Sequence, residues 1–103
     1  MDDQTLLNQI MKLKTTGVAT FACDTPKGKV ELLRVMPGLA AEEVLQDVVK
    51  MLSCMTELTR RAMARPDDVE VLMRSGYYLN GMAKALVEDL LLGLHGESGA
   101  TAH

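Results

Sequence analysis

Two long segments with apolar residues at helical spacing, separated by Pro66, constrain the fold of this chain more than any other feature. Residues 40–64 and 68–94 carry apolar side chains at intervals of three and four positions, which is the period of an amphipathic helix. The first segment has acidic residues at 42–43 and basic residues at 60–61, the charge order that a helix dipole favours. Because only a tight turn joins them, the two helices are predicted to form an antiparallel hairpin.

Two shorter elements precede this pair. Residues 3–15 follow the same apolar spacing and predict a short amphipathic helix. Residues 18–24 and 29–35 are predicted to be strands, joined by the sequence Thr-Pro-Lys-Gly at 25–28, which is typical of a type I turn. A lone β-hairpin is only marginally stable in water, so it must pack on the helices or pair with another chain.

The predicted fold class is therefore mainly α with a minor β part. With 103 residues the chain holds one domain, predicted over 1–96, with the β-hairpin at about 18–35 and a disordered tail at 97–103. Only 3% of the residues are aromatic, whereas eight are methionine, and a core of Leu, Met, Val and Ala suits the packing of helix on helix. The second long helix is predicted to end at Gly93 or Gly96.

The second long helix is apolar around most of its circumference. Its charged residues Glu70, Arg74, Lys84 and Glu88 share an arc of about 80° by the 3.6-residue period, and one neighbouring helix cannot cover the remainder. We therefore expect a homodimer in which two hairpins pack as a four-helix-type bundle. The residues expected to make the dimer or partner interface are Val48, Met51, Leu52, Met55, Leu79, Met82, Leu86 and Leu90.

The sequence offers no catalytic constellation. The two histidines, His95 and His103, lie near the end of the chain. Adjacent carboxylates such as Glu88 and Asp89 do not face each other on a helix, so they are predicted to be solvated surface charges. We expect a protein that is not an enzyme and has no catalytic residues, no metal site and no cofactor.

Charge and cysteine content restrict the partners and the compartment. A net charge of −3 argues against direct binding to nucleic acid, which requires clustered Lys and Arg. No apolar run approaches the ~20 residues of a membrane span, and the acidic N-terminus is not typical of a secretory signal. Cys23 and Cys54 have no metal-ligand spacing and are expected to be reduced thiols. Together these features predict a cytoplasmic protein that does not bind membranes.

Two glycines in the second long helix and two adjacent leucines in the second strand depart from the regular apolar pattern. Gly76 and Gly81 lie inside the second long helix; a close helix crossing is expected at Gly76, whereas the pattern gives no reason for Gly81. The adjacent Leu32 and Leu33 predict that both faces of the second strand need cover, by the helices on one side and by another protein on the other.

The central region carries a resemblance to known proteins. Residues 35–38 are Val-Met-Pro-Gly, an acidic-started helix follows at 41–45, and residues 83–89 read Ala-Lys-Ala-Leu-Val-Glu-Asp. Through these features residues 30–92 resemble a family of short pseudomonad proteins, mostly of unknown function. Within that group, the size and layout are similar to those of antiactivators of the QslA type. The resemblance implies a dimer that sequesters a quorum-sensing transcription activator of the LasR type by covering its dimerisation surface.

Three function classes remain open at this point. The first is a non-enzymatic homodimer that binds and inactivates a partner protein. The second is a structural or assembly subunit of a larger complex, which would use the same apolar surface for a permanent partner. The third is a helical dimer that holds a small apolar ligand between its helices.

Overall fold

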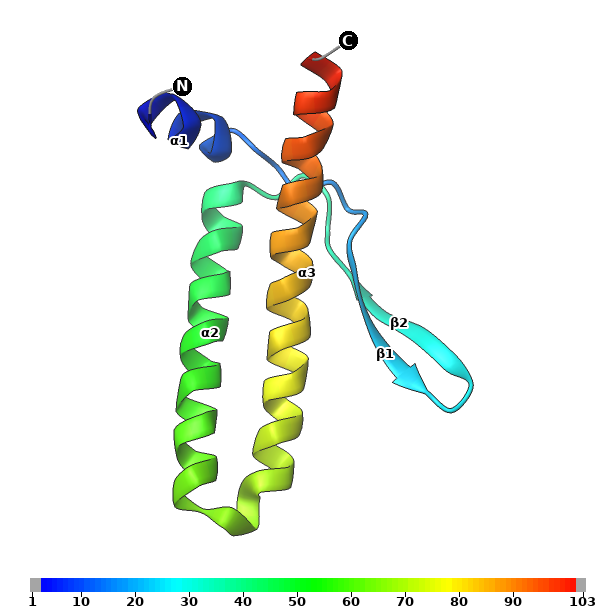
Figure 1. The fold of residues 1–103 in the computed structure, drawn as a ribbon, viewed down its shortest axis with the longest axis vertical. Coiled ribbons are helices and arrows are strands. Elements are labelled where there is room, and N and C mark those ends of the chain that lie inside the picture. The colour runs from blue at the N-terminus through cyan, green and yellow to red at the C-terminus, as the bar shows by residue number, and fades with distance from the viewer. Residues whose placement is uncertain (1–2, 102–103) are drawn as a thin grey trace.

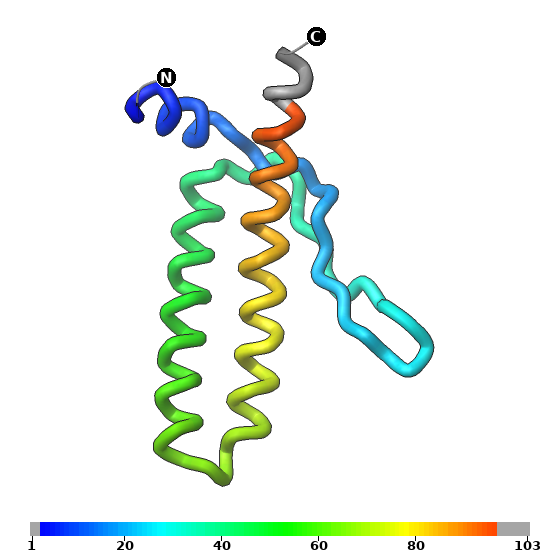
Figure 2. Tube along the Cα trace, viewed as in Figure 1, coloured from blue at the N-terminus to red at the C-terminus, as the bar shows by residue number. Residues whose placement is uncertain are grey.

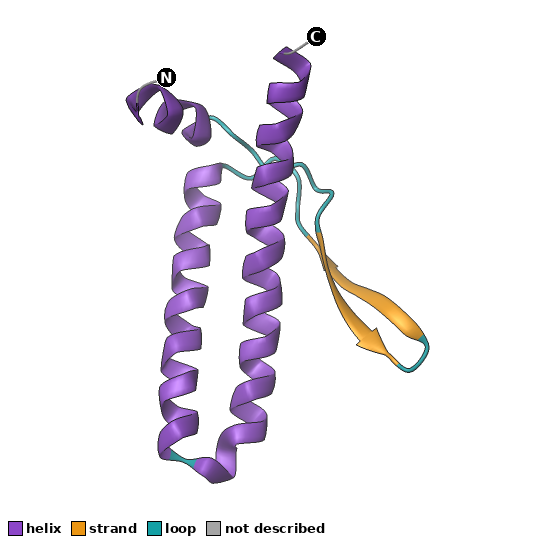
Figure 3. Cartoon of the chain, in the orientation of Figure 1, coloured by secondary structure: helices purple, strands orange, loops and turns teal. Residues whose placement is uncertain are grey.

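Two long helices and a β-hairpin lie side by side and make up most of the structure (Figures 1 and 3). The computed structural model describes the backbone of residues 3–101 and the side chains of residues 3–96. The predicted order of a short helix, a hairpin and two antiparallel helices is confirmed. The elements are α1 (Asp3–Met11), β1 (Thr20–Thr25), β2 (Gly28–Arg34), α2 (Ala41–Ala64), the 3-10 turn η1 (Pro66–Asp68) and α3 (Val69–Thr101).

The α2–α3 hairpin forms because each helix has an apolar stripe that faces the other. Arg65 leaves helical geometry, with φ of −132° and ψ of 83°, because the residue before a proline is sterically pushed out of the α region. Pro66 then opens η1, and α3 starts at once in the opposite direction. The core between the helices contains Val44 and Val48 of α2 together with Ala83 and Leu90 of α3.

α3 occupies the middle of the molecule, with α2 on one side and the β-hairpin on the other (Figure 1). The radius of gyration is 16.6 Å, whereas a compact domain of this length has a value of ~13 Å. The principal-axis extents are 54 × 36 × 19 Å, so the molecule is long and thin. Most domains bury their apolar faces between two packed layers, but here the two helices and the hairpin form a single row.

The hairpin contains a β-bulge at the adjacent leucines Leu32 and Leu33. Phe21 pairs with Leu33, and Ala22 pairs with Glu31, so Leu32 is the extra residue opposite this step. Because a bulge shifts the alternation by one residue, Leu33 and Val30 share one side of the hairpin with Phe21, while the charged side chains take the other. Leu32 and Leu33 are 47% and 53% exposed in the single chain, so the expectation that another protein covers part of this strand stays a prediction.

Two connecting segments cross α3 at the same level, near its residues 89–93 (Figure 2). Residues 12–19 lead from α1 to β1, and residues 35–40 lead from β2 to α2. The two segments pair with each other: Ala41 N–H donates to Leu13 O at 3.0 Å, and Thr15 N–H donates to Leu39 O at 2.9 Å. The predicted extent of the first helix, to residue 15, is wrong because this pairing draws the chain out of the helix after Met11.

The end of α3 also differs from the prediction. The helix runs through Gly93 and Gly96 to Thr101, so neither glycine ends it. An isolated glycine weakens a helix by only ~1 kcal/mol relative to alanine and does not by itself terminate one. The predicted disordered tail at 97–103 overlaps the last turn of α3, and its final two residues lie outside the described residues.

Candidate interaction surface

A buried carboxylate fixes the first connecting segment to α3. The side chain of Asp89 is 0% exposed. It accepts backbone hydrogen bonds from Ala19 at 2.9 Å, Val18 at 3.0 Å and Gly17 at 3.4 Å, and also from the Thr16 N–H. The Thr16 hydroxyl donates to it as well, at 2.9 Å. A single side chain thus binds four successive N–H groups and holds the segment that leads into β1.

The electrostatics of this anchor follow from its donors. Burial alone would raise the pKa of the Asp89 carboxyl, because desolvation disfavours its charged form. The hydrogen bonds from Ala19, Thr16 and Gly17 outweigh burial and hold the pKa below its ordinary value. Asp89 is therefore a buried anion, and its interpretation as a solvated surface charge was wrong.

The neighbouring Glu88 shows what distinguishes the two carboxylates. Glu88 is half exposed and lies 3.7 Å from the ammonium of Lys84, one turn before it. Asp89 has Ala85 and Gly93 one turn before and after it, so no basic residue on its own helix can pair with it. An acidic residue on an apolar helix face without such a partner is the sequence signal that could have identified the anchor.

Thr15 anchors the second connecting segment. Its hydroxyl donates to Met36 O and accepts from the Leu39 N–H at 2.9 Å, and the residue is buried. Gly38 N–H donates to Thr15 O at 2.9 Å. Together, Thr15 and Asp89 set the position at which the hairpin leaves the helices.

The aromatic residues meet where β1 touches α3. The ring of Phe21 lies over Gly81, where an added Cβ would be only 1.6 Å from a ring carbon. The ring centroids of Tyr77 and Tyr78 are each 5.9 Å from that of Phe21. Gly81 is thus explained by the approach of this ring. The close crossing expected at Gly76 is wrong, because a Cβ there would meet no atom within 4 Å.

An apolar groove lies between the hairpin and α3. Its volume is about 160 Å³, and it is lined by Phe21 of β1, by residues 33–36, which include Arg34, and by Met82, Ala85 and Leu86 of α3. Ligand pockets for small molecules usually measure about 300–1,000 Å³, whereas a cavity of about 150 Å³ holds one benzene ring. The groove therefore has the size of one large side chain.

The broad side of the α2–α3 hairpin carries a long uncharged surface, which we call the long-helix face. Helical periodicity places its residues on one side of both helices, and they are exposed apart from the half-buried Leu45. Thr59, Met73 and Asn80 line a common groove between α2 and α3, so the two stripes form one surface. The face consists of Leu45, Val49, Leu52, Thr56, Thr59 and Met63 of α2 and Val69, Met73, Asn80, Val87 and Leu91 of α3.

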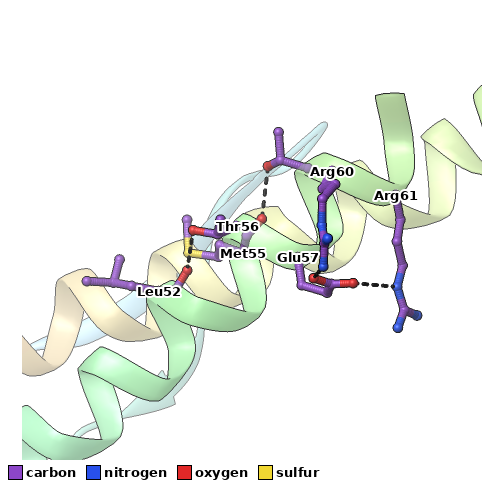
Figure 4. Close-up of polar contacts among 7 residues, drawn as sticks. Leu52, Met55, Thr56, Glu57, Arg60 and Arg61 are labelled. Carbon is purple, nitrogen blue, oxygen red and sulfur yellow. Dashed lines mark hydrogen bonds and ion pairs between the residues drawn. The ribbon is translucent and has the colours of Figure 1, made fainter. Parts of the chain in front are cut away.

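The threonines on this face hide their polar atoms. The Thr56 hydroxyl donates to Leu52 O at 3.1 Å, and the Thr59 hydroxyl donates to Met55 O at 2.9 Å (Figure 4). Since each hydroxyl is satisfied within α2, the side chain can present its methyl group to a neighbour without leaving the hydroxyl unpaired. The surface is thus more apolar than its composition indicates.

Most charged residues of α2 lie on the side away from this face, whereas helical periodicity places Glu42 and Arg60 at its edge, next to Val49. Glu57 binds Arg60, and its second carboxylate oxygen lies 3.3 Å from Arg61 Nε (Figure 4). Hydrogen bonds from Arg60 and Arg61 lower the pKa of Glu57. Cys54 is exposed on this charged side, as its helical position predicts.

Most of the predicted interface residues are buried or half-buried within the single chain. Val48 and Leu90 are buried in the core, and Leu52, 48% exposed, is the one member on the long-helix face. The others are half-buried: Met51, Met55, Leu79, Met82 and Leu86. The helical wheel identified apolar stripes, but it does not say which stripe α2 and α3 use for each other. The wheel did not single out the exposed stripe, because the residues near its middle (Thr56, Thr59 and Asn80) are polar by type.

Within residues 3–96, no three His, Cys, Asp or Glu side chains are grouped so that they could hold a metal ion. Cys23 is half-buried and Cys54 exposed, and both are free thiols. No helix in the described part of the chain has the length and apolar character to cross a membrane. His103 lies outside the described residues.

Comparison with known proteins places the structure in a family. The model of one family, described as a protein of unknown function (DUF3077), matches residues 15–93. The match starts at Thr15 and extends past Asp89, so it includes both anchors and the hairpin and leaves out α1. The sequence resemblance had covered only residues 30–92. Neither the curated proteins nor the solved structures give a match to the chain.

Proposed function

Since the chain belongs to the DUF3077 family of proteins of unknown function, we propose its function from the structure: it is a non-enzymatic homodimer that binds and inactivates a partner protein. The observation that carries this proposal is the large apolar surface that the single chain leaves open. The long-helix face and the groove beside the hairpin both belong to that surface.

The amount of open surface supports association. A compact monomer of 11.2 kDa has an accessible area of about 5,700 Å², whereas this chain has 7694 Å². The difference is about 2,000 Å², and exposed large apolar side chains lie on α1, the hairpin, α2, α3 and the connecting segments. Contiguous apolar patches on soluble monomers rarely exceed a few hundred Å², and larger ones mark sites of protein association.

The finer form of the proposal is that the partner is a transcription activator of the LasR type. The size and layout of the chain, which are similar to those of small antiactivators, support it. The net charge of −3 also favours a mechanism that acts on the activator rather than on DNA. Such an inhibitor would cover the apolar dimerisation surface of the activator's ligand-binding domain, and the activator needs that surface to bind its operator as a dimer.

A permanent subunit of a larger complex is the second candidate, and the same open surface favours it. The groove beside the hairpin, with a volume of about 160 Å³, is smaller than the usual pocket for a small molecule. The groove between α2 and α3 has a volume of about 340 Å³ and a mostly apolar lining, so a small apolar ligand between the helices is a third candidate.

Size-exclusion chromatography with light scattering tests the proposal. The full chain is measured alone and then mixed with the ligand-binding domain of a LasR-type activator. We expect a dimer alone and a heavier mixed species that no longer contains an activator dimer. A dimer that leaves the activator unshifted at high concentration would refute the antiactivator role, and aggregation of the chain alone would favour the permanent subunit.

A further inference from the structure

We infer that a second copy of this chain covers the long-helix face, turned end for end, with a two-fold axis that crosses α3 at Asn80. This inference rests on the proposed homodimer and adds its interface and its symmetry. It assigns the long-helix face to self-association and leaves the groove beside the hairpin to the partner.

The spacing of the exposed residues along α3 is symmetric about Asn80. Met73 and Val87 lie seven residues, or two helical turns, to either side of it. Val69 and Leu91 lie eleven residues, or three turns, to either side. When two copies of α3 pack antiparallel about Asn80, each valine therefore meets a methionine or leucine of the other copy, and Asn80 meets its own counterpart.

The exposed residues on α2 are also spaced symmetrically about a central position. Leu45 pairs with Met63, Val49 with Thr59, and Leu52 with Thr56, and all three pairs are centred on position 54. The centre of α2 lies level with that of α3, because Met55 and Asn80 line the same groove between the helices. One axis therefore relates both stripes to their copies, as an isologous interface requires.

The chemistry of the face suits a second copy. None of its residues carries a charge, so like charges do not meet across the axis. The hydroxyls of Thr56 and Thr59 are already bonded within α2. The amide of Asn80 has both donors and acceptors, so two such amides can pair across the axis and fix the register, as single buried asparagines do in coiled coils.

The accessible area of the chain is also consistent with a homodimer interface. Homodimer interfaces bury about 2,000–5,000 Å² in total, or at least ~1,000 Å² per chain. The chain exposes about 2,000 Å² beyond a compact monomer of its mass, which is more than one such interface needs.

A second contact site remains accessible in this dimer. Met82 and Leu86 line the groove beside the hairpin, and helical periodicity places them on the side of α3 away from Asn80. A dimer built on the long-helix face can therefore bind a partner without dissociating.

Disulfide cross-linking tests the axis directly. In a full chain with Cys23→Ser and Cys54→Ser, the substitution Asn80→Cys places one thiol at the proposed axis. We expect rapid formation of a covalent dimer on mild oxidation, because two thiols then face each other across the interface. The matched control keeps Cys54 as its only thiol; Cys54 lies near the same level but is exposed on the charged side of α2 and should stay monomeric on a non-reducing gel. Cross-linking through Cys54, or none through Asn80→Cys, would overturn the inference.

A second measurement does not depend on cysteine chemistry. Leu52→Asp adds a charge to the centre of the face at an exposed site, so the chain should fold and the dimer should weaken at least ~100-fold in light scattering. Gln46→Asp adds the same charge at an exposed site outside the face and should leave the dimer intact. If both variants remain dimeric, the face is not the interface. If Leu52→Asp becomes monomeric but still captures the activator domain, the inference stands and partner binding uses another surface.

Discussion

Removal of the Asp89 carboxylate should detach the hairpin from the helices and destabilise the whole chain. In the wild type this group binds the backbone N–H groups of residues 16–19 and the Thr16 hydroxyl. Asp89→Ala leaves these donors without an acceptor beneath a crossing segment. Ala19 is buried, so its N–H cannot turn to water, whereas the exposed Thr16 and Val18 can recover part of their loss by hydration.

The expected loss of stability follows from the difference between the buried Ala19 N–H and the exposed N–H groups. A hydrogen bond to a charged group contributes ~1.5–3 kcal/mol, and an unsatisfied buried donor costs ~1–3 kcal/mol. Counting the Ala19 bond in full and the others in part gives a loss of about 3–5 kcal/mol in the free energy of unfolding. Since domains of this size are stable by only ~5–15 kcal/mol, the variant should lose a large fraction of its stability.

Urea denaturation followed by far-UV circular dichroism measures this loss. With a slope of ~2 kcal/mol per molar urea, the midpoint should fall by about 2 M. Glu88→Ala is the matched control, because it removes only the exposed pair with Lys84 and should cost less than ~0.5 kcal/mol. A loss below ~1 kcal/mol for Asp89→Ala, or equal losses for the two variants, would refute the reasoning.

The anchor also predicts a pH dependence. Asp89→Asn keeps the shape but replaces one oxygen by an amide group that faces N–H donors, so it should lose most of the same stability. Because the pKa of Asp89 is lowered on folding, its contribution is fully present above the unfolded value of 3.8 and is lost as the pH falls through the lower native pKa. The difference in unfolding free energy between wild type and Asp89→Asn should therefore be constant from neutral pH to about 4 and shrink below it.

Three further predictions concern single positions. Gly81→Ala should destabilise the chain by about 2–3 kcal/mol because its methyl overlaps the Phe21 ring, whereas Gly76→Ala should stabilise it by up to ~1 kcal/mol in thermal denaturation. Thr15→Val should cost about 1–3 kcal/mol in urea denaturation, because it leaves the Leu39 N–H without its acceptor. A thiol reagent should modify Cys54 rapidly and the half-buried Cys23 slowly, and similar rates in the native protein would contradict the packing of β1 on α3.

The helical part of the fold was predictable because it depends on periodic burial. The apolar spacing over 40–64 and 68–94 located α2 and α3, and Pro66 located the turn between them. The turn sequence at 25–28 located the hairpin for a similar reason, since Pro and Gly restrict the backbone locally. The end of α1 was not predictable in this way, because residues 12–19 leave the helix to pair with a segment more than 20 positions away.

The candidate surface was only partly predictable from the sequence. The width of the apolar arc on α3 correctly indicated more contacts than one neighbour provides. It did not indicate that the contact of α3 with α2 would use Leu90 or that the hairpin would use Gly81, because both choices depend on how segments distant in sequence meet. The partners of Asp89 were not predictable, because they are backbone N–H groups that every residue type except proline carries; only the lack of a basic neighbour on α3 pointed to the anchor.

The composition of α3 is explained when its neighbours are considered together. One side packs on α2 through Ala83 and Leu90, and another accepts the hairpin at Gly81 and Asp89. A third side, centred on Asn80, is exposed in the single chain. Only a narrow arc remains for water, and it holds the ion pairs of Arg74 with Glu70 and of Lys84 with Glu88. A helix with one neighbour needs a single apolar stripe, so the third apolar side of α3 would lower solubility without stabilising the monomer. The proposed second copy gives that side a structural reason.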